Sequence, residues 1–381
     1  MKLIPFFTSL VLLCLPLMMV SNAHADRVEP TGRDTPVIAT FDKSSPPAQL
    51  DIWKDESGGY DSDNDSLWGR NTWVCLSSSN PIYGQCKTTV TGVEEGNTLI
   101  PILFTEQRSH MTQVINLTGY HKISVSVGNA CWAAGVIGGP YQVYAAMEKN
   151  CGGVKHNDES LLTVYVTSQE LQKLPTGGIW EANLKMNLMQ WSPAAKLADW
   201  NAHFTLNVTD NNNQQIYLPE FGQAAPRVDL NMRPLPGTGG KQAQMNGAAN
   251  IDMCLYDGYG SNSTSFTLKF DDRQQGTTQR NNGYFSIYSD HGDVNQDSGR
   301  IDYYVKMQAP DGKYVSIIRG EDLVIPHIQT ARVRPVHLPG IPQAVLCIPA
   351  PLELSTKTLD INSKQAGHYT GHLIVNFTSQ L

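Results

Sequence analysis

The chain has 381 residues and a formal net charge of −7 at pH 7. This length predicts about two domains, at the usual size of roughly 150 residues each. Only 17% of the residues are charged, and no basic tract occurs in the sequence. The composition therefore argues against a nucleic-acid partner, because such partners are bound through clustered Lys and Arg.

The N-terminus has the pattern of a signal peptide over residues 1–25. Lys2 precedes an apolar run from Leu3 to Val20, and Ala23 and Ala25 are small residues two positions apart. This pattern predicts cleavage after residue 25. No later apolar run is long enough to cross a bilayer, so we expect the mature chain to be soluble and exported.

The remainder of the sequence predicts a series of short β-strands. After an irregular lead-in that ends near Asp65, apolar and polar residues alternate in segments separated by Gly, Asn, Asp and Pro. Alternation with period two is typical of half-buried strands, and many short strands with turns between them predict β-sandwiches. The segments are 123–127, 162–166, 180–188, 203–208, 265–270, 301–307 and 314–318.

A polar stretch divides this strand series into two halves. Residues 209–213 read Thr-Asp-Asn-Asn-Asn, between strand patterns that end at Val208 and resume at Gln215. Polar, turn-prone residues in such a place are typical of a linker. We therefore predict a first domain over residues 26–210, a linker at 211–213 and a second domain over 214–381.

The last predicted strand, residues 371–377, runs almost to the end of the sequence. Tyr369, Leu373, Val375 and Phe377 share one face by the period-two pattern. No further strand pattern follows, and a sheet edge must be covered or paired. The pattern therefore predicts a second sandwich that lacks its final strand.

Cysteine usage indicates an oxidising compartment. Besides Cys14 in the predicted signal peptide, the chain has six cysteines, and an even number is expected where disulfides form. The sequence leaves the connectivity open, but closeness along the chain favours three bridges: Cys75–Cys86, Cys131–Cys151 and, by remainder, Cys254–Cys347.

The sequence contains no familiar catalytic or cofactor motif. It lacks H-E-x-x-H, G-x-S-x-G, a P-loop and a dinucleotide fingerprint. Residues 61–65 resemble the start of a calcium loop, but Ser66 and Thr72 stand where an EF-hand needs Gly and Glu. A polar turn explains this segment, and also residues 290–293, better than a metal site. We expect no metal, no cofactor and no enzymatic activity.

An ordered set of segments resembles the CfaE/CblD family, the minor tip-adhesin subunits of class 5 fimbriae that the alternate chaperone–usher pathway assembles. The resemblance covers essentially the whole mature chain. Its segments are 104–109 (FTEQRS), 174–180 (LPTGGIW), 227–234 (RVDLNMRP), 252–259 (DMCLYDGY) and 366–371 (AGHYTG).

The resemblance implies two immunoglobulin-like β-sandwiches: an N-terminal adhesin domain and a C-terminal pilin domain without its final strand. It also implies four partners, namely a periplasmic pilus chaperone, an outer-membrane usher, a major pilin subunit and a host-surface glycan or glycoprotein. The chaperone and then the major pilin would supply the missing strand by donor-strand complementation. Tyr369, Leu373, Val375 and Phe377 would line the groove that this strand fills. The expected location is the fimbrial tip, on the bacterial cell surface.

The family's receptor site is a basic pocket in the adhesin domain. Its first arginine corresponds to Arg70, within residues 69–76 (GRNTWVCL). An adjacent arginine pair corresponds to Gln190 and Trp191, so two positive charges are replaced. These two side chains suit a neutral sugar, through amide hydrogen bonds and stacking, better than an anionic glycan.

The sequence is also compatible with two other functions. The loss of the arginine pair is also compatible with a structural initiator of the pilus that binds no receptor. Two β-domains with several tryptophans, a residue type that stacks on sugar rings, are compatible with an exported carbohydrate-active enzyme. Trp180 lies on the apolar face of its strand and is expected in the core.

Overall fold

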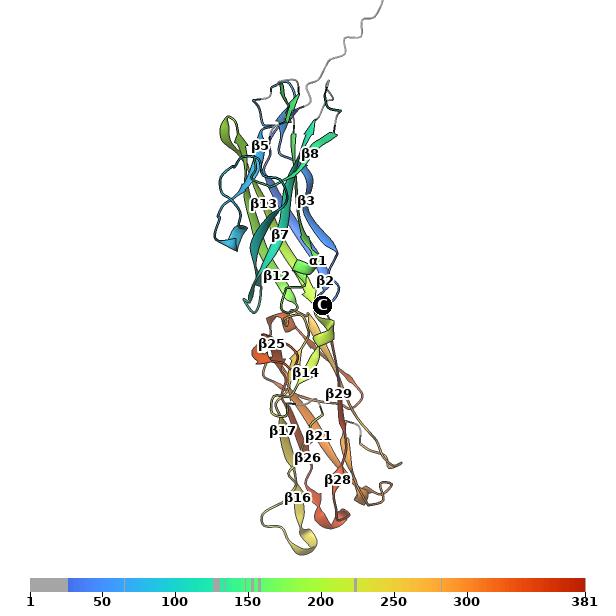
Figure 1. Cartoon of the computed structure of the whole chain (residues 1–381). Coiled ribbons are helices and arrows are strands. Elements are labelled where there is room, and N and C mark those ends of the chain that lie inside the picture. Colours follow the sequence, from blue (N-terminus) through green and yellow to red (C-terminus); the bar gives the residue numbers. More distant parts are fainter. Residues whose placement is uncertain are drawn as a thin grey trace, which may run out of the picture.

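The computed structural model describes residues 27–64, 66–125, 131–133, 135–147, 149–151, 154–156, 159–222, 225–281 and 283–380. Two β-rich domains are stacked end to end, and the C-terminus lies between them (Figure 1). This confirms the predicted all-β class with two sandwich domains. Among the described helices, none is long and apolar enough to span a membrane. The predicted signal peptide lies outside the described residues.

The first domain is built on one large sheet in the order β2-β13-β12-β6-β7-β11-β3, with β5 beside β12 and β8 beside β7. The helical elements are η1 (Pro81–Tyr83) and α1 (Ser168–Leu171). The strands are β1 (Arg27–Val28), β2 (Arg33–Asp42), β3 (Gln49–Ser57), β4 (Tyr60–Asp61), β5 (Asn71–Cys75), β6 (Thr98–Glu106), β7 (Thr112–Val125), β8 (Gly135–Tyr141), β9 (Lys149–Cys151), β10 (Val154–His156), β11 (Glu159–Thr167), β12 (Gly178–Trp191) and β13 (Ala194–Thr209).

The hydrophobic core of this domain follows the predicted alternation. In β12, every second residue from Trp180 to Leu188 is buried. Three tryptophans meet edge-on in the core, because Trp200 contacts Trp53 at 5.3 Å and Trp73 at 5.2 Å between ring centroids. Such pairs add about 0.5–1.5 kcal/mol each beyond the burial of their area. The predicted strand at 123–127 lies in β7 as far as Val125, and its last two residues lie outside the described part.

The second domain divides its strands among several small sheets, chiefly β17-β26-β21-β20-β28 and β23-β19-β29. Its 3-10 turns are η3 (Gly240–Gln242), η4 (Asp297–Gly299), η5 (Ile328–Thr330) and η6 (Ile361–Ser363), and η2 (Asn211–Asn213) precedes it. The strands are β14 (Gln215–Tyr217), β15 (Arg233–Pro234), β16 (Gln244–Asn246), β17 (Ala248–Ile251), β18 (Cys254–Tyr256), β19 (Ser265–Asp272), β20 (Phe285–Ser289), β21 (Arg300–Gln308), β22 (Tyr314–Ser316), β23 (Asp322–Pro326), β24 (Arg334–His337), β25 (Ala344–Pro349), β26 (Leu352–Thr356), β27 (Leu359–Asp360), β28 (Tyr369–Thr370) and β29 (Leu373–Gln380).

Two of the expected disulfides are formed in the described residues. Cys75–Cys86 joins the end of β5 to the loop after η1, and Cys254–Cys347 joins β18 to β25 across 93 positions of sequence. Cys254 and Cys347 are fully buried. The expected partner of Cys131 is Cys151, whose side chain lies outside the described residues, so that pairing stays a prediction.

Polar side chains and close backbone contacts join the two domains. The buried carboxylate of Glu106 accepts hydrogen bonds from the Ile179 amide, at 3.2 Å, and from the Asn262 side chain of the second domain, at 3.1 Å. A Cβ atom on Gly177 would lie only 1.9 Å from the carbonyl oxygen of Gly258. Three of the family-like segments, around positions 106, 177 and 258, therefore meet at this junction.

The Arg108 side chain crosses the junction. Its guanidinium donates hydrogen bonds to the carbonyl oxygens of Ser261, Ile328 (2.9 Å) and Ala331, all in the second domain. Charge-assisted hydrogen bonds of this kind are the stronger ones in proteins. Arg108 thus fixes the first domain against the turn η5 of the second.

Candidate functional site

The sheet of the second domain has a free edge at its last strand. β29 pairs antiparallel with β19, from Leu373 opposite Asp272 to Gln380 opposite Ser265. Within the described residues, no strand pairs with the other side of β29. A strand paired on one side leaves a row of N–H and C=O groups without ladder partners. This edge can accept a further strand.

Apolar side chains accompany the free edge. Leu373, Val375 and Phe377 face inward and pack against the second core. The Phe377 ring meets Phe266 edge-on, with centroids 4.9 Å apart. Phe266 is fully buried, whereas the three β29 side chains are only half-buried. A strand laid beside β29 would therefore cover apolar surface that now contacts water.

Tyr369 does not belong to this row, contrary to the face predicted from the sequence. It lies in β28, which pairs with β20 in the other sheet. Its hydroxyl, with one proton to donate, lies between two acceptors, the carbonyl oxygens of Ser298 at 2.8 Å and Gln365 at 2.7 Å. The chain changes sheets at Gly371, where a Cβ atom would lie 2.8 Å from the Ile287 side chain. The last strand accordingly begins at Leu373 rather than at residue 371.

A strand-like segment without a ladder partner packs on the same core. Within residues 226–232, Val228, Leu230 and Met232 face the second core, while Asp229 and Asn231 are exposed. This is the alternation of a half-buried strand, yet residues 225–232 are not assigned to any strand. The second domain thus presents two strand-like segments over one hydrophobic core: this one, which has no ladder partner, and β29, which is paired on one side only.

The far end of β29 abuts the domain junction. The Gln380 carbonyl oxygen accepts a hydrogen bond from the Thr264 amide at 2.8 Å. The Gln214 side chain, just after the inter-domain turn, donates to the Ser379 hydroxyl at 3.3 Å. The C-terminus is marked at this position in Figure 1. The free edge therefore runs from the base of the second domain up to the first.

The expected receptor residues come together where β5 begins and β12 ends, toward the end of the first domain that is far from the second (Figure 1). Gln190 pairs with Asn71 in the β12–β5 ladder. The Trp191 amide donates to the Arg70 carbonyl oxygen at 2.9 Å. The side chains of Arg70 and Trp191 are half-buried, so part of each reaches the surface.

The side chain of Gln190, by contrast, is buried in the first domain. The residue is 5% exposed. Its oxygen accepts the Trp68 amide at 3.0 Å, and its nitrogen donates to the carbonyl oxygens of Ser66 and Pro193, each at 3.1 Å. These bonds fasten the loop before β5 to the β12–β13 hairpin. The amide is thus fully used, contrary to the expected role of Gln190 in binding a sugar.

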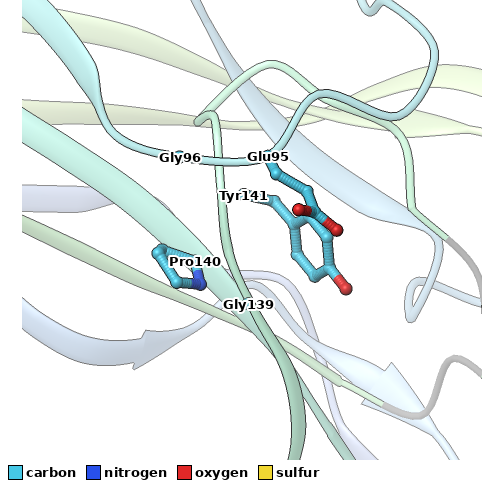
Figure 2. Close-up of a pocket in the computed structure, with 5 residues that line it drawn as sticks. All are labelled: Glu95, Gly96, Gly139, Pro140 and Tyr141. Atoms are coloured by element: carbon cyan, nitrogen blue, oxygen red, sulfur yellow. The ribbon is translucent and has the colours of Figure 1, made fainter.

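A cavity of about 410 Å³ lies in the same domain, beside β8. Figure 2 shows Glu95 and Tyr141 at its wall, together with Gly139 and Pro140 of β8. Glu95 and Tyr141 are bridge partners, and the Gly96 amide donates to the Pro140 carbonyl oxygen at 3.0 Å. Glu95 is exposed and can accept hydrogen bonds from hydroxyl groups, whereas Tyr141 is only 3% exposed and packs against His121.

The two acidic segments form polar turns. The Asp61 carboxylate accepts the amides of Asp63, at 3.0 Å, and Asn64, at 3.2 Å. The Asp290 carboxylate accepts the Thr370 hydroxyl at 2.6 Å. Asp65, in the first segment, lies outside the described residues. Among the residues that the structure describes, no three His, Cys, Asp or Glu side chains are grouped as metal ligands.

Sequence reasoning missed three features of these sites. It passed over Glu95 and Tyr141, which lie far apart in sequence and have no distinguishing motif. It passed over the alternation of Val228, Leu230 and Met232, which pack against the second core from a segment outside the assigned strands. It also ended the β12 pattern at Leu188, where two more positions would have placed Gln190 on the buried face.

Both halves of the sequence match one family of fimbrial proteins. Residues 22–211 match the first domain of the CFA/I fimbrial subunit CfaE, and residues 214–381 match its second domain. The CFA/I fimbrial subunit CfaE of Escherichia coli is 32% identical over 322 residues, which cover 82% of this chain and 81% of that relative.

Solved structures show the same relationship. CfaE, the adhesive subunit of the CFA/I fimbria of enterotoxigenic Escherichia coli, superposes with a TM-score of 0.78 at 26% identity, covering 93% of this chain and 94% of CfaE. A chaperone–tip adhesin complex of CFA/I fimbriae biogenesis matches with a TM-score of 0.66 at 26% identity, covering 94% of this chain and 98% of the matched chain. The chain therefore belongs to the CfaE family of fimbrial tip adhesins.

Proposed function

We propose that a strand from the next fimbrial subunit completes the second domain of this tip adhesin. The observation that carries the proposal is the free edge of β29, with Leu373, Val375 and Phe377 half-exposed beside it. Backbone pairing along the edge would provide affinity, and alternate side chains entering the apolar surface would fix the register.

The proposed route begins with export to the periplasm, where a pilus chaperone covers the free edge. At the outer-membrane usher, the N-terminal extension of the major pilin replaces the chaperone strand. The chain then caps the fibre on the bacterial surface. The domain arrangement supports this polarity, because the first domain closes one end of β29 and leaves the other end for the fibre (Figure 1).

The experiment compares the mature chain with a fusion that carries a major-pilin N-terminal strand after Leu381. A matched control fusion has the same strand with its alternate apolar residues replaced by Ser. We expect the first fusion alone to raise the melting temperature of the second domain, by roughly 2–4 °C for each kcal/mol gained in a domain of this size. All tryptophans lie between Trp53 and Trp200, so their fluorescence gives an internal reference from the first domain. Equal melting of the two fusions would refute the proposal.

We further propose that the distal part of the first domain attaches to a host glycan. Support comes from the half-buried Arg70 and Trp191 and from the cavity at Glu95 and Tyr141. The test measures binding of fimbriated cells to host cells and to a glycan array. Variants Arg70→Ala, Trp191→Ala and Glu95→Gln should weaken binding, whereas Lys241→Ala, in a turn of the second domain, should not.

A structural initiator without receptor binding is the second candidate. The observation that favours it is Gln190, whose amide is buried and fully bonded, so the family's pocket lacks two cations and gains no free polar group. Absence of wild-type adhesion on the same array, with normal fibre assembly, would establish this alternative.

We also propose that the protein has no enzymatic activity, in line with relatives that are named as a fimbrial subunit and as an adhesive subunit. Incubation of the purified, strand-complemented protein with a glycan panel should give no turnover. Cleavage of a glycan that remains with the protein through purification, and that is lost when a residue of this chain is substituted, would contradict this proposal.

A further inference from the structure

The second domain carries a polar cavity that strand exchange does not use. It has a volume of about 440 Å³. Its wall is formed by backbone where β16 meets β17 and by the side chains of Asn231, Arg233, Asn246, Ser355 and Thr356. This wall contains a guanidinium, amides and hydroxyls but no carboxylate. In a chain whose net charge is −7, such a cavity favours an anionic group.

Local contacts fix the shape of the cavity. A Cβ atom on Gly247 would lie 2.5 Å from both the Leu230 carbonyl oxygen and the Met232 sulfur, so glycine lets these backbones approach. Asn231 has a left-handed backbone with φ of 52°. Its amide donates to the Asp229 carboxylate at 2.8 Å, and its side chain donates to the Asp229 carbonyl oxygen at 3.1 Å. The cavity is therefore preformed in the isolated chain.

A second cation lies beside the cavity. The Lys357 ammonium sits 4.8 Å from the Tyr284 ring centroid and 5.7 Å from that of Tyr304. Hydrogen bonds that the ammonium donates to the hydroxyls of Tyr284 and Tyr304 raise the pKa of Lys357. Tyr304 is directly opposite Ser355 in the β21–β26 ladder, and directly opposite side chains are close neighbours on one face. Arg233 and Lys357 thus flank one polar surface.

The free edge of β29 decides where the partner's body must lie. Its Gln380 end is closed, because the Thr264 amide holds Gln380 and Arg108 of the first domain holds Ile328, whose amide donates to Thr264. A globular body attached to an incoming strand must then sit at the opposite end, near Leu373. β16 and β28 lie at that end of the second domain (Figure 1).

We propose that Arg233 and Lys357 dock carboxylate side chains on the body of the subunit that donates its strand. Arg233 directly follows Met232, the last inward-facing residue of the unpaired segment 226–232. A strand laid along this segment brings its own body to Arg233. The docking site rests on the proposed function, because it requires a strand donor, but its two cations, Arg233 and Lys357, lie outside the segment along which the strand is laid.

The test uses the major pilin of the fimbria that bears this chain, as the whole protein and as the synthetic peptide of its N-terminal strand. Association with the full chain is followed at low and high salt for Arg233→Glu, Lys357→Glu and the control Lys313→Glu. Lys313 is exposed and lies in the turn between β21, which ends at Gln308, and β22. We expect peptide binding to change less than about twofold in all variants. Association with the whole pilin at low salt should fall roughly tenfold for Arg233→Glu and Lys357→Glu only, because a reversed charge opposes the steering of the partner.

The outcomes separate the two proposals. Failure of the wild-type chain to bind the peptide would refute strand completion, and the docking site with it. Normal peptide binding together with unchanged whole-pilin association in Arg233→Glu and Lys357→Glu would refute the docking site alone. A loss confined to binding of a periplasmic chaperone would also overturn it, since the surface would then serve assembly rather than the fibre.

Discussion

His121 should make the stability of the first domain depend on pH. It lies on β7 with 1% of its surface exposed, between the rings of Trp73 and Tyr141 at centroid distances of 6.3 and 5.7 Å. Burial lowers the pKa of His121 to about 4, from an ordinary value of 6.5, because a charged imidazolium loses its hydration there. The folded domain therefore holds this ring neutral.

The size of the effect follows from linkage. Below about pH 6.5 the unfolded chain binds a proton at His121, whereas the folded chain binds one only below about pH 4. The contribution of neutral His121 to the stability of the first domain is thus fully present above about pH 6.5 and is lost as the pH falls. Each pH unit in this interval removes about 1.4 kcal/mol, so the total loss approaches about 3 kcal/mol at pH 4.

Two carboxyl groups of the first domain, Asp55 and Glu170, titrate below this interval. Burial opposes the shift, but hydrogen bonds and ion pairs with Lys122 and Lys173 outweigh it and lower the pKa values of Asp55 and Glu170 from 3.8 and 4.5. Their stabilising contributions are lost only at lower pH. Between pH 4.5 and 6.5, the slope should therefore come mainly from His121.

The assay is urea unfolding followed by tryptophan fluorescence at several pH values from 4.5 to 7.5. All tryptophans lie in the first domain, so the signal reports that domain. His121→Gln and His121→Phe should each flatten the pH profile, whatever their effect on absolute stability. His203→Gln, at an exposed histidine, should keep the wild-type slope. A wild-type profile that is flat across this interval would refute the reasoning.

Three further predictions concern the elements around the sites. Gln190→Ala should destabilise the first domain by about 2–3 kcal/mol in urea unfolding, because it removes three hydrogen bonds in a buried place; a loss under about 0.5 kcal/mol would contradict the inward role. Arg108→Ala should speed amide hydrogen exchange in η5 and at Ala331 just after it, because the carbonyl oxygens of Ile328 and Ala331 lose their donor; unchanged exchange would mean that the junction does not depend on this side chain. Replacing Cys254 and Cys347 together with Ala should cost the second domain about 4 kcal/mol, since their bridge closes 93 positions, and should leave tryptophan-reported unfolding unchanged; a shifted tryptophan transition would show coupled domains.

Much of the fold was predictable because its strands alternate strictly. Residues 180–188 showed their buried face in the sequence, since a half-buried strand must place every second side chain in the core. Two disulfides were predicted correctly: Cys75–Cys86 from the short distance along the sequence, and Cys254–Cys347 because these two cysteines remained after the closer pairs were assigned. Such local signals need no knowledge of how distant segments meet.

The sites were harder to predict because they depend on distant contacts. Gln190 is polar, so the alternation looked finished before it, yet three hydrogen bonds make its burial favourable. Tyr369 and Phe377 share a period-two pattern, but the chain changes sheets at Gly371 between them. The cavity of Glu95 and Tyr141 lies between the loop before β6 and the end of β8, and the approach of these two segments has no signature in the sequence.

Hydrogen exchange with and without the major-pilin strand peptide tests the central claim most directly. If an incoming strand completes the second domain, amides along β29 and in residues 226–232 should gain protection on peptide binding. Amides of β23, which lies on the far side of β19, should show no change in protection. Protection at β23 instead, or no new protection along β29, would contradict the account.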